Sequence, residues 1–415
     1  MPPRGYSGGW DRVRPVSRSC LGGWVSLIPL PLLLAVSIPS SAGAATATAT
    51  DSPGSSPVTA VASLKGSDLL LLLPAWNGFY DVSAGAGYND NLLLGSTARQ
   101  QSGFGILRAN TALWRRPVED GQEFLLTLAA TDRRYWAPRD MDHDDALQLQ
   151  ARYTRQFGPR WALALEADGF YSDQILDTSS IDTPGVRQRI HGGRLDGLPG
   201  IRWKSGESTP WVELAPIVSQ TWLRAPYDSF SEHGMRLSTG RPYGWRSEWR
   251  LDYSLRFRDY ESHPAVTSGG LALPGTHLGT LRHEVQWVDR HYWDEARRWF
   301  TTTKLRGRFA TDNASGFYDS RNLAVAEQLN LRTSRWELAL EAEYGRWDFP
   351  HQPVPAAGGG AHRGLDDWVL VARVERRVGL SWKLFLEYER ESVRAADPFD
   401  GFLANVYTLG VTREF

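Results

Sequence analysis

The segment 245–258 reads WRSEWRLDYSLRFR, and it decides the fold class because its side chains alternate in polarity. One face of an extended strand would carry the apolar members, Trp245, Trp249, Leu251, Tyr253, Leu255 and Phe257. The other face would carry the charged and polar members, Arg246, Glu248, Arg250, Asp252, Ser254, Arg256 and Arg258. Successive side chains of a strand point to opposite sides, so the segment predicts a strand with one apolar and one charged face.

The same alternation recurs along the chain after Phe79, for example in 298–311, 335–346 and 381–391. Short and long connections alternate between these segments, which is typical of membrane barrels with short periplasmic turns and long extracellular loops. Two long connections would follow one another unless a weak strand lies at 234–240, and this strand brings the count to about sixteen. We therefore predict an all-β fold, a transmembrane antiparallel β-barrel in the outer membrane of a Gram-negative-type bacterium.

A soluble β-sandwich or solenoid is the alternative fold. Its apolar face would form a buried core, and its outward face would be polar. Such a fold gives no reason for tryptophans to mark one end of strand after strand. The barrel is therefore favoured over the sandwich.

Residues 1–44 have the three parts of a secretory signal peptide. A basic start is followed by an apolar run over 21–38 and by the small-residue sequence Ala42-Gly43-Ala44. A transmembrane anchor is the alternative, but Pro29 and Pro31 interrupt a run that is already short for a span. The only cysteine, Cys20, lies inside this segment. We predict a signal peptide over 1–44, a flexible linker over 45–77 and the barrel over 78–415.

Aromatic residues are abundant, with 18 Trp, 15 Tyr and 15 Phe, in a chain whose formal charge is −1. This charge predicts no nucleic-acid partner. Tryptophans that begin strands directly after short turns predict an aromatic girdle at one membrane interface, formed by Trp161, Trp211, Trp245, Trp299, Trp336 and Trp382. Trp211 is out of step with the apolar face of its own strand, which predicts either a bulge or a ring that points inward.

The chain ends in Phe415, and Tyr407, Leu409 and Val411 precede it on the same face, with Arg413 as a departure. Here the chain resembles bacterial outer-membrane proteins, porin-like barrels included. The resemblance implies that Phe415 is an assembly signal read by the barrel-assembly machinery. Gly87-Tyr88-Asn89-Asp90-Asn91 also resembles a segment near the first strand of outer-membrane barrels associated with surface-polysaccharide systems.

The inward face of the predicted barrel carries two walls of opposite charge. The basic wall consists of Arg246, Arg250, Arg256, Arg258, Arg282, Lys304, Arg306 and Arg308. The acidic wall consists of Glu337, Glu341, Glu343, Glu387, Glu389 and Glu391. In a water-filled pore such walls produce a transverse field that orients polar solutes. An equally weighted interpretation is that these charges neutralise neighbours across the strands, as Arg373 and Arg377 suggest.

Two further features carry weaker hypotheses. Asp140, Asp142, Asp144 and Asp145 flank His143 in a predicted outer loop, without the glycine and distal glutamate of a calcium loop. We expect a solvated loop there, or one bridged to lipopolysaccharide by a divalent ion. His283 is expected to face lipid, where an ionisable group is costly. Either a neutral histidine stacked on an aromatic ring or a subunit contact in a homo-oligomer explains it.

The sequence predicts a passive outer-membrane channel for small polar solutes, surrounded by lipid and lipopolysaccharide. It contains no metal-spaced Cys/His set, phosphate-cradling glycine loop or nucleophile elbow, so no enzyme, metal or cofactor is predicted. The alternatives are a structural or assembly barrel for export or surface display of polysaccharide or protein, and an outer-membrane lipid-modifying enzyme.

Overall fold

The computed structural model of the protein describes residues 75–96, 99–117, 121–136, 141–177, 187–206, 209–225, 227–244, 247–354, 362–397 and 400–415. The predicted signal peptide and nearly all of the predicted linker lie outside this part of the chain. Trp245, Arg246 and Asp140 also lie outside it.

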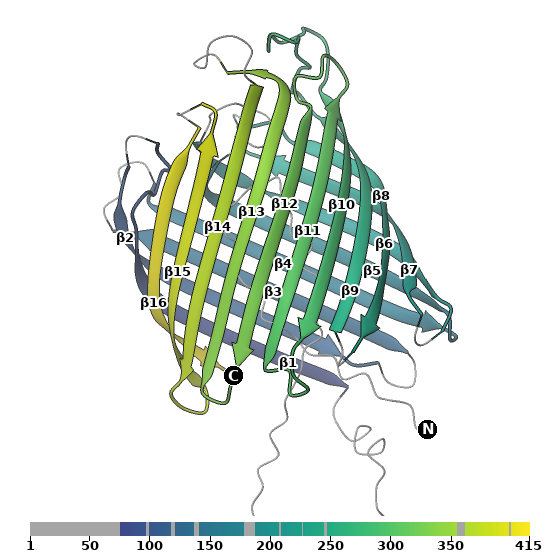
Figure 1. Cartoon of the computed structure of the whole chain (residues 1–415), viewed down its shortest axis with the longest axis vertical. Coiled ribbons are helices and arrows are strands. Elements are labelled where there is room, and N and C mark those ends of the chain that lie inside the picture. Colours follow the sequence, from purple (N-terminus) through teal and green to yellow (C-terminus); the bar gives the residue numbers. More distant parts are fainter. Residues whose placement is uncertain are drawn as a thin grey trace, which may run out of the picture. The chain divides into compact units, whose positions relative to one another are not determined.

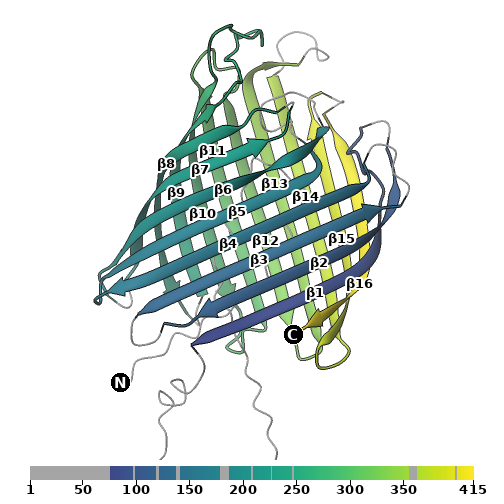
Figure 2. The ribbon, with the colours of Figure 1, turned by 180° about the vertical axis from the view of Figure 1, so that it is seen from behind.

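Sixteen antiparallel strands form one closed barrel, in which each strand pairs with its neighbours in sequence (Figures 1 and 2). The strands are β1 (Trp76–Asn89), β2 (Ser102–Arg115), β3 (Gln122–Tyr135), β4 (His143–Phe157), β5 (Trp161–Asp177), β6 (Arg187–Lys204), β7 (Trp211–Leu223), β8 (Phe230–Tyr243), β9 (Ser247–Tyr260), β10 (Gly279–Tyr292), β11 (Trp299–Asp312), β12 (Ser320–Arg332), β13 (Trp336–Pro353), β14 (His362–Arg377), β15 (Trp382–Ala395) and β16 (Phe402–Glu414). The pairing of β1 with β16 closes the sheet, which removes both open edges. The predicted fold class and strand count are confirmed.

The two faces of β9 show how the sequence pattern becomes a barrel wall. Arg250, Asp252 and Ser254 are buried on the inner face, whereas Leu251 and Tyr253 are exposed on the outer face. The same arrangement, with polar side chains inside and apolar side chains outside, extends around the barrel and is the reverse of that in a soluble protein. Leucine, valine and aromatic side chains dominate the outer face. An outer surface of this kind needs an apolar solvent, which excludes the soluble sandwich.

Strand β8 is longer than the predicted weak strand at 234–240. Gly234, Gly240 and Pro242 break its apolar pattern, yet it pairs with β7 and β9 over almost its full length. The ladder hydrogen bonds to two neighbours support it despite its poor local signal. As a consequence Glu232, which the prediction placed in a loop, belongs to the inner wall.

Short turns occupy the end of the barrel where β1 begins and β16 ends, and long loops occupy the other end (Figure 1). We call these the short-turn end and the long-loop end. Gly158, in the turn between β4 and β5, has a φ of 73°, which glycine adopts without strain. No helix in the described part of the chain is long and apolar enough to cross a bilayer.

Candidate functional site

The inner wall of β8–β10 is organised around one carboxylate that the sequence analysis missed. Glu232 on β8 has a side chain that is only 1% exposed, and four guanidinium groups surround its oxygens. The distances are 3.4 Å for Arg256, 3.0 Å for Arg258, 3.4 Å for Arg282 and 2.8 Å for Arg194. Three members of the predicted basic wall therefore converge on a single negative charge, and the local excess of positive charge remains.

The other described members of the basic wall also lie on the inner face, most of them close to carboxylates. Arg250 pairs with Asp252 at 2.7 Å. Arg308 pairs with Glu284 at 2.6 Å, and Arg306 reaches across β12 to Glu343 at 3.0 Å. Lys304 interacts electrostatically with two carboxylates of β13, those of Glu341 and Glu343.

The predicted acidic wall occupies the inner face of β13 and β15. Glu387 accepts hydrogen bonds from Arg108 and Arg373, and Glu337 accepts one from Lys383. The remaining members of this wall, Glu341, Glu343, Glu389 and Glu391, alternate with outward-facing residues of the same strands. On β12, which separates this wall from the basic one, the inner face carries uncharged residues such as Asn322 and Asn330. Charges of both walls therefore pair with neighbours across the strands, as the second sequence interpretation expects, and the field across the lumen stays a prediction.

A mixed group of charges lies on the inner face of β5–β8. Arg236 lies 2.8 Å from Glu166 and 3.2 Å from Glu213, and Arg202 lies 2.7 Å from Glu213. None of these residues was predicted as a site residue. The alternation of Glu213 with Leu214 in β7 is the signal that could have found it.

An apolar cluster narrows the mouth at the long-loop end. Leu92 and Leu94, on the connection after β1, are 0% exposed and pack among inner-face side chains. These side chains come from seven strands and include Phe104, Ile106, Tyr135, Ile175, Trp347, Phe349, Leu365, Val393 and Phe402. The part of the connection around Leu92 and Leu94 therefore folds into the barrel mouth.

The segment Gly87–Asn91 fixes this inward fold. Asp90 accepts hydrogen bonds from the backbone and side-chain amides of Asn405 on β16, at 2.6 and 2.7 Å. Asn91 donates to the carbonyl oxygens of Gly95 and Leu403, at 2.9 Å each. A Cβ on Gly87 would lie 2.3 Å from the Phe104 ring, so only glycine leaves room for that ring. The motif ties the loop to the closing strand.

Four of the predicted girdle tryptophans lie on the outer face at the short-turn end. Trp161, Trp299, Trp336 and Trp382 are the first residues of their strands and are between 43% and 52% exposed. Trp211 does not join them. Its ring lies 4.4 Å from the Arg202 guanidinium on the inner face, because β7 pairs with β6 without a register shift. The structure thus shows the inward ring and not the bulge.

The predicted acidic loop is divided by the start of β4. His143 and Asp145 face outward, whereas Asp144 faces inward and pairs with Arg133 at 3.5 Å. On the outer face, Asp132, Asp145 and Asp173 are directly opposite one another on neighbouring strands. Like charges in such a row repel, unless cations intervene.

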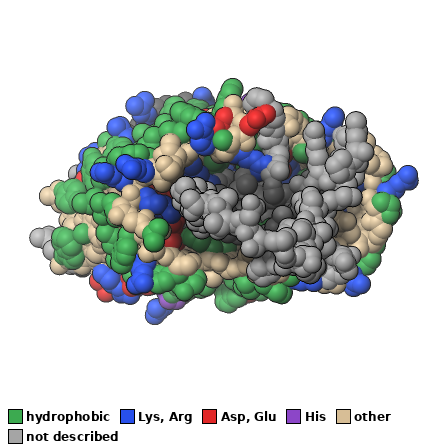
Figure 3. Space-filling model, turned by 90° about the horizontal axis from the view of Figure 1, so that it is seen from below, with side chains coloured by type: hydrophobic (Ala, Val, Ile, Leu, Met, Phe, Trp, Pro, Cys, Tyr) green, Lys and Arg blue, Asp and Glu red, His purple; other side chains and the backbone are tan. Residues whose placement is uncertain are grey.

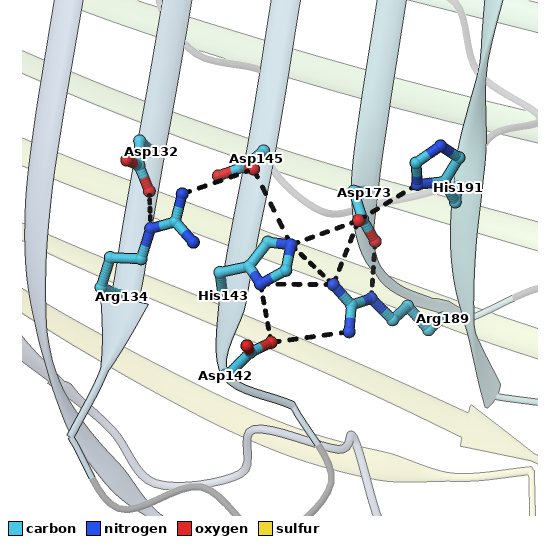
Figure 4. Close-up of polar contacts among 8 residues, drawn as sticks. All are labelled: Asp132, Arg134, Asp142, His143, Asp145, Asp173, Arg189 and His191. Atoms are coloured by element: carbon cyan, nitrogen blue, oxygen red, sulfur yellow. Dashed lines mark hydrogen bonds and ion pairs between the residues drawn. The ribbon is translucent and has the colours of Figure 1, made fainter.

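Cationic and histidine side chains surround this row of aspartates (Figure 4). Asp173 lies 2.6 Å from Arg189, 3.3 Å from His143 and 3.1 Å from His191. Arg134 lies 2.7 Å from Asp132. No group of His, Cys, Asp or Glu within the described ranges is arranged to hold a metal ion.

His283 faces outward, and its Nδ1 atom lies 2.9 Å from the hydroxyl of Tyr253. The residues directly opposite His283 are Leu255 of β9 and Phe309 of β11, and the centroid of the Tyr253 ring lies 6.2 Å from that of the imidazole.

The observation that decides the class is the combination of a closed barrel, an apolar outside and a charged inside. Viewed from the short-turn end, hydrophobic side chains cover much of the perimeter (Figure 3). The chain is an outer-membrane β-barrel. No family model matches it, and no curated protein matches it.

Solved structures of outer-membrane proteins are similar to this barrel. A loop L8 deletion mutant of OmpT from Vibrio cholerae is 8% identical, with 82% of this chain and 100% of that chain covered and a TM-score of 0.41. OccAB1 from Acinetobacter baumannii is 10% identical, with 82% and 97% covered and a TM-score of 0.41. OprD from Pseudomonas aeruginosa is 11% identical, with 82% and 95% covered and a TM-score of 0.40.

Proposed function

We propose that this outer-membrane barrel is a channel for small polar solutes. The observation that carries the proposal is the Glu232 cluster, in which one inner carboxylate meets Arg194, Arg256, Arg258 and Arg282. Arg194 is shared with Asp196 at 2.8 Å, so the cluster holds four cations and two anions. A dry protein core disfavours such an excess of positive charge, because an uncompensated buried charge costs several kcal/mol. Water in a lumen lowers that cost.

The separation of the two arcs supports a preference for polar solutes. A basic arc on β8–β11 and an acidic arc on β13 and β15 set up a field across the lumen. Such a field orients dipolar or zwitterionic solutes and disfavours apolar ones. Arg306, which lies 3.0 Å from Glu343, and Lys304, which interacts with Glu341 and Glu343, join the two arcs across β12. The proposed field acts across the lumen away from this junction.

A structural or export-related barrel is the second candidate. The apolar cluster around Leu92 and Leu94 favours it, because a mouth narrowed by buried side chains passes fewer solutes. The lipid-modifying enzyme has less support, since the hydroxyl beside His283 belongs to Tyr253 and the residues directly opposite, Leu255 and Phe309, are apolar.

Conductance in planar bilayers tests the proposal. We expect measurable channels whose anion preference falls when Arg250, Arg282 and Arg306 are all replaced by glutamine. Glutamine is chosen because glutamate would place new carboxylates beside Asp252, Glu232 and Glu343. The effect should shrink in high salt, because the Debye length falls to about 3 Å at 1 M.

The matched control replaces three outer-face arginines, Arg346, Arg390 and Arg394, by glutamine. It removes the same amount of charge from the exposed outside, so selectivity should stay as in the natural protein. A correctly folded barrel without conductance would favour the structural alternative. Equal selectivity changes in both variants would contradict the assigned role of the inner arginines.

A further inference from the structure

A hollow of about 650 Å³ lies on the outer face of the barrel near the short-turn end. It is lined by Arg241 and Tyr243 of β8, Trp249 and Leu251 of β9, and Trp287 and Asp289 of β10. The lumen and its charged walls play no part in it. The hollow is independent of the proposed channel.

Its polar rim is a row of three residues in register across three strands. Arg241 is directly opposite Trp249, and Trp249 is directly opposite Asp289. The cation of Arg241 and the anion of Asp289 therefore lie on either side of the Trp249 indole ring. Their strands are separated by one strand, so their Cα atoms are roughly 10 Å apart.

The Asp289 carboxylate is held in place by Tyr243 at the end of β8, two strands away. The Tyr243 hydroxyl lies 2.7 and 2.9 Å from the two oxygens of Asp289. The Tyr243 ring in turn stacks on His291, with centroids 5.9 Å apart. Within the described ranges, Arg241 forms no ion pair, so its guanidinium is available to an anion.

The floor of the hollow is apolar. From the pair of Trp249 and Asp289, the next outward-facing pair toward the middle of the barrel is Leu251 and Trp287, which are directly opposite each other. The next pair in that direction is Tyr253 and Val285, and Val285 is 46% exposed. A hydrocarbon chain can lie along this column of outward-facing side chains.

We propose that this hollow binds a phospholipid whose headgroup carries a phosphate and an amine. The Arg241 guanidinium would pair with the phosphate, and the amine would lie over Trp249 and against Asp289. An anionic headgroup without an amine would leave the Asp289 carboxylate without a cationic partner. The amine is therefore what selects the lipid.

Native mass spectrometry of the full barrel, released from bilayers of equal phosphatidylethanolamine and phosphatidylglycerol, tests this proposal. We expect retained phosphatidylethanolamine to exceed phosphatidylglycerol several-fold. Asp289→Asn should abolish that preference, and Arg241→Gln should lower the retention of both lipids. Tyr243→Phe, which keeps the ring and removes the hydroxyl, should weaken the preference through misplacement of Asp289.

The matched control is Arg376→Gln. Arg376 lies 5.3 Å from the Trp336 ring on the outer face at the same end, directly opposite it in register. No change in lipid preference is expected there. Equal retention of both lipids by the natural protein would overturn the proposal, as would an unchanged preference in a folded Asp289→Asn barrel. A dimer mass without retained lipid would assign the hollow to a second copy instead.

Discussion

The Arg108 guanidinium on β2 donates hydrogen bonds of 2.6 and 3.1 Å to the Glu387 carboxylate on β15, and so spans both β1 and β16. On the two strands between them, the Ser83 and Thr412 hydroxyls lie 2.8 Å apart. This inner-face contact therefore crosses the seam at which the first and last strands close the barrel. The seam joins the most distant parts of the chain, so its closure costs more chain entropy than any other pairing.

Replacing Arg108 with alanine should destabilise the closed barrel by roughly 3–5 kcal/mol, because Glu387 would keep a buried charge with one partner fewer. The measurement is the temperature at which the folded band disappears on a heat-modifiability gel. Arg108→Met combined with Glu387→Met should recover part of the loss, since no charge is then left unpaired. Equal loss in the single and double variants would refute a role for the ion pair.

The Phe415 ring stacks on Tyr80 of β1, with centroids 4.7 Å apart and an angle of 12° between the rings. We expect deletion of Phe415 to impair assembly in the outer membrane. Loss of an assembly signal and loss of stacking on Tyr80 would both produce this defect. Tyr80→Ala separates these two explanations, because it removes the stacking partner and leaves the terminal residue. If Tyr80→Ala assembles normally in cells, recognition of Phe415 by the assembly machinery is supported. An equal defect in both variants would assign the effect to stacking.

We expect Leu94 to narrow the mouth at the long-loop end of the barrel and so to limit conductance. Its φ of 53° lies in the left-handed region, which asparagine tolerates. Leu94→Asn keeps the backbone and removes apolar packing from the cluster around Leu92, so single-channel conductance should rise. Leu380→Asn, at a turn residue that is 98% exposed, is the control and should leave conductance unchanged. Unchanged conductance in Leu94→Asn would show that the loop does not limit flow.

We expect the stability of the turn between β10 and β11 to depend on pH through the Asp294 carboxylate. The backbone N–H of Trp299 and the backbone and side chain of Arg298 donate to its carboxylate, which holds its pKa below the ordinary value. This stabilisation is present at a pH above the pKa of an aspartate in the unfolded chain, about 3.9. It is lost as the pH falls through the lower pKa of Asp294 in the folded chain. Asp294→Asn should therefore unfold in less urea than the natural protein at pH 7, with a difference that narrows at low pH.

The control for this titration is Glu295→Gln, which removes a neighbouring exposed charge in the same turn. Its urea midpoint should follow that of the natural protein at each pH. A gap between Asp294→Asn and the natural protein that stays constant down to pH 2 would argue against titration of Asp294.

The sequence alone determined that this chain forms a barrel, because the period of two is a local property of each strand. The alternation in 245–258 assigned Arg250 and Asp252 to one face and Leu251 and Tyr253 to the other, and the structure agrees. The alternation of short and long connections required the weak strand over 234–240, and β8 is found there. Even Trp211 was recognised as out of step with its strand.

Only the tertiary structure decided which charges meet. Glu232 lies just before the predicted strand, and its partners Arg194, Arg256 and Arg282 come from β6, β9 and β10. Those meetings depend on the stagger between strands, as does the pairing of His283 with Leu255, and stagger is set by the closure of the whole sheet. The inward fold of Leu92 and Leu94 likewise depends on Asn405, more than three hundred residues away along the chain, because Asp90 reaches it only once β16 pairs with β1.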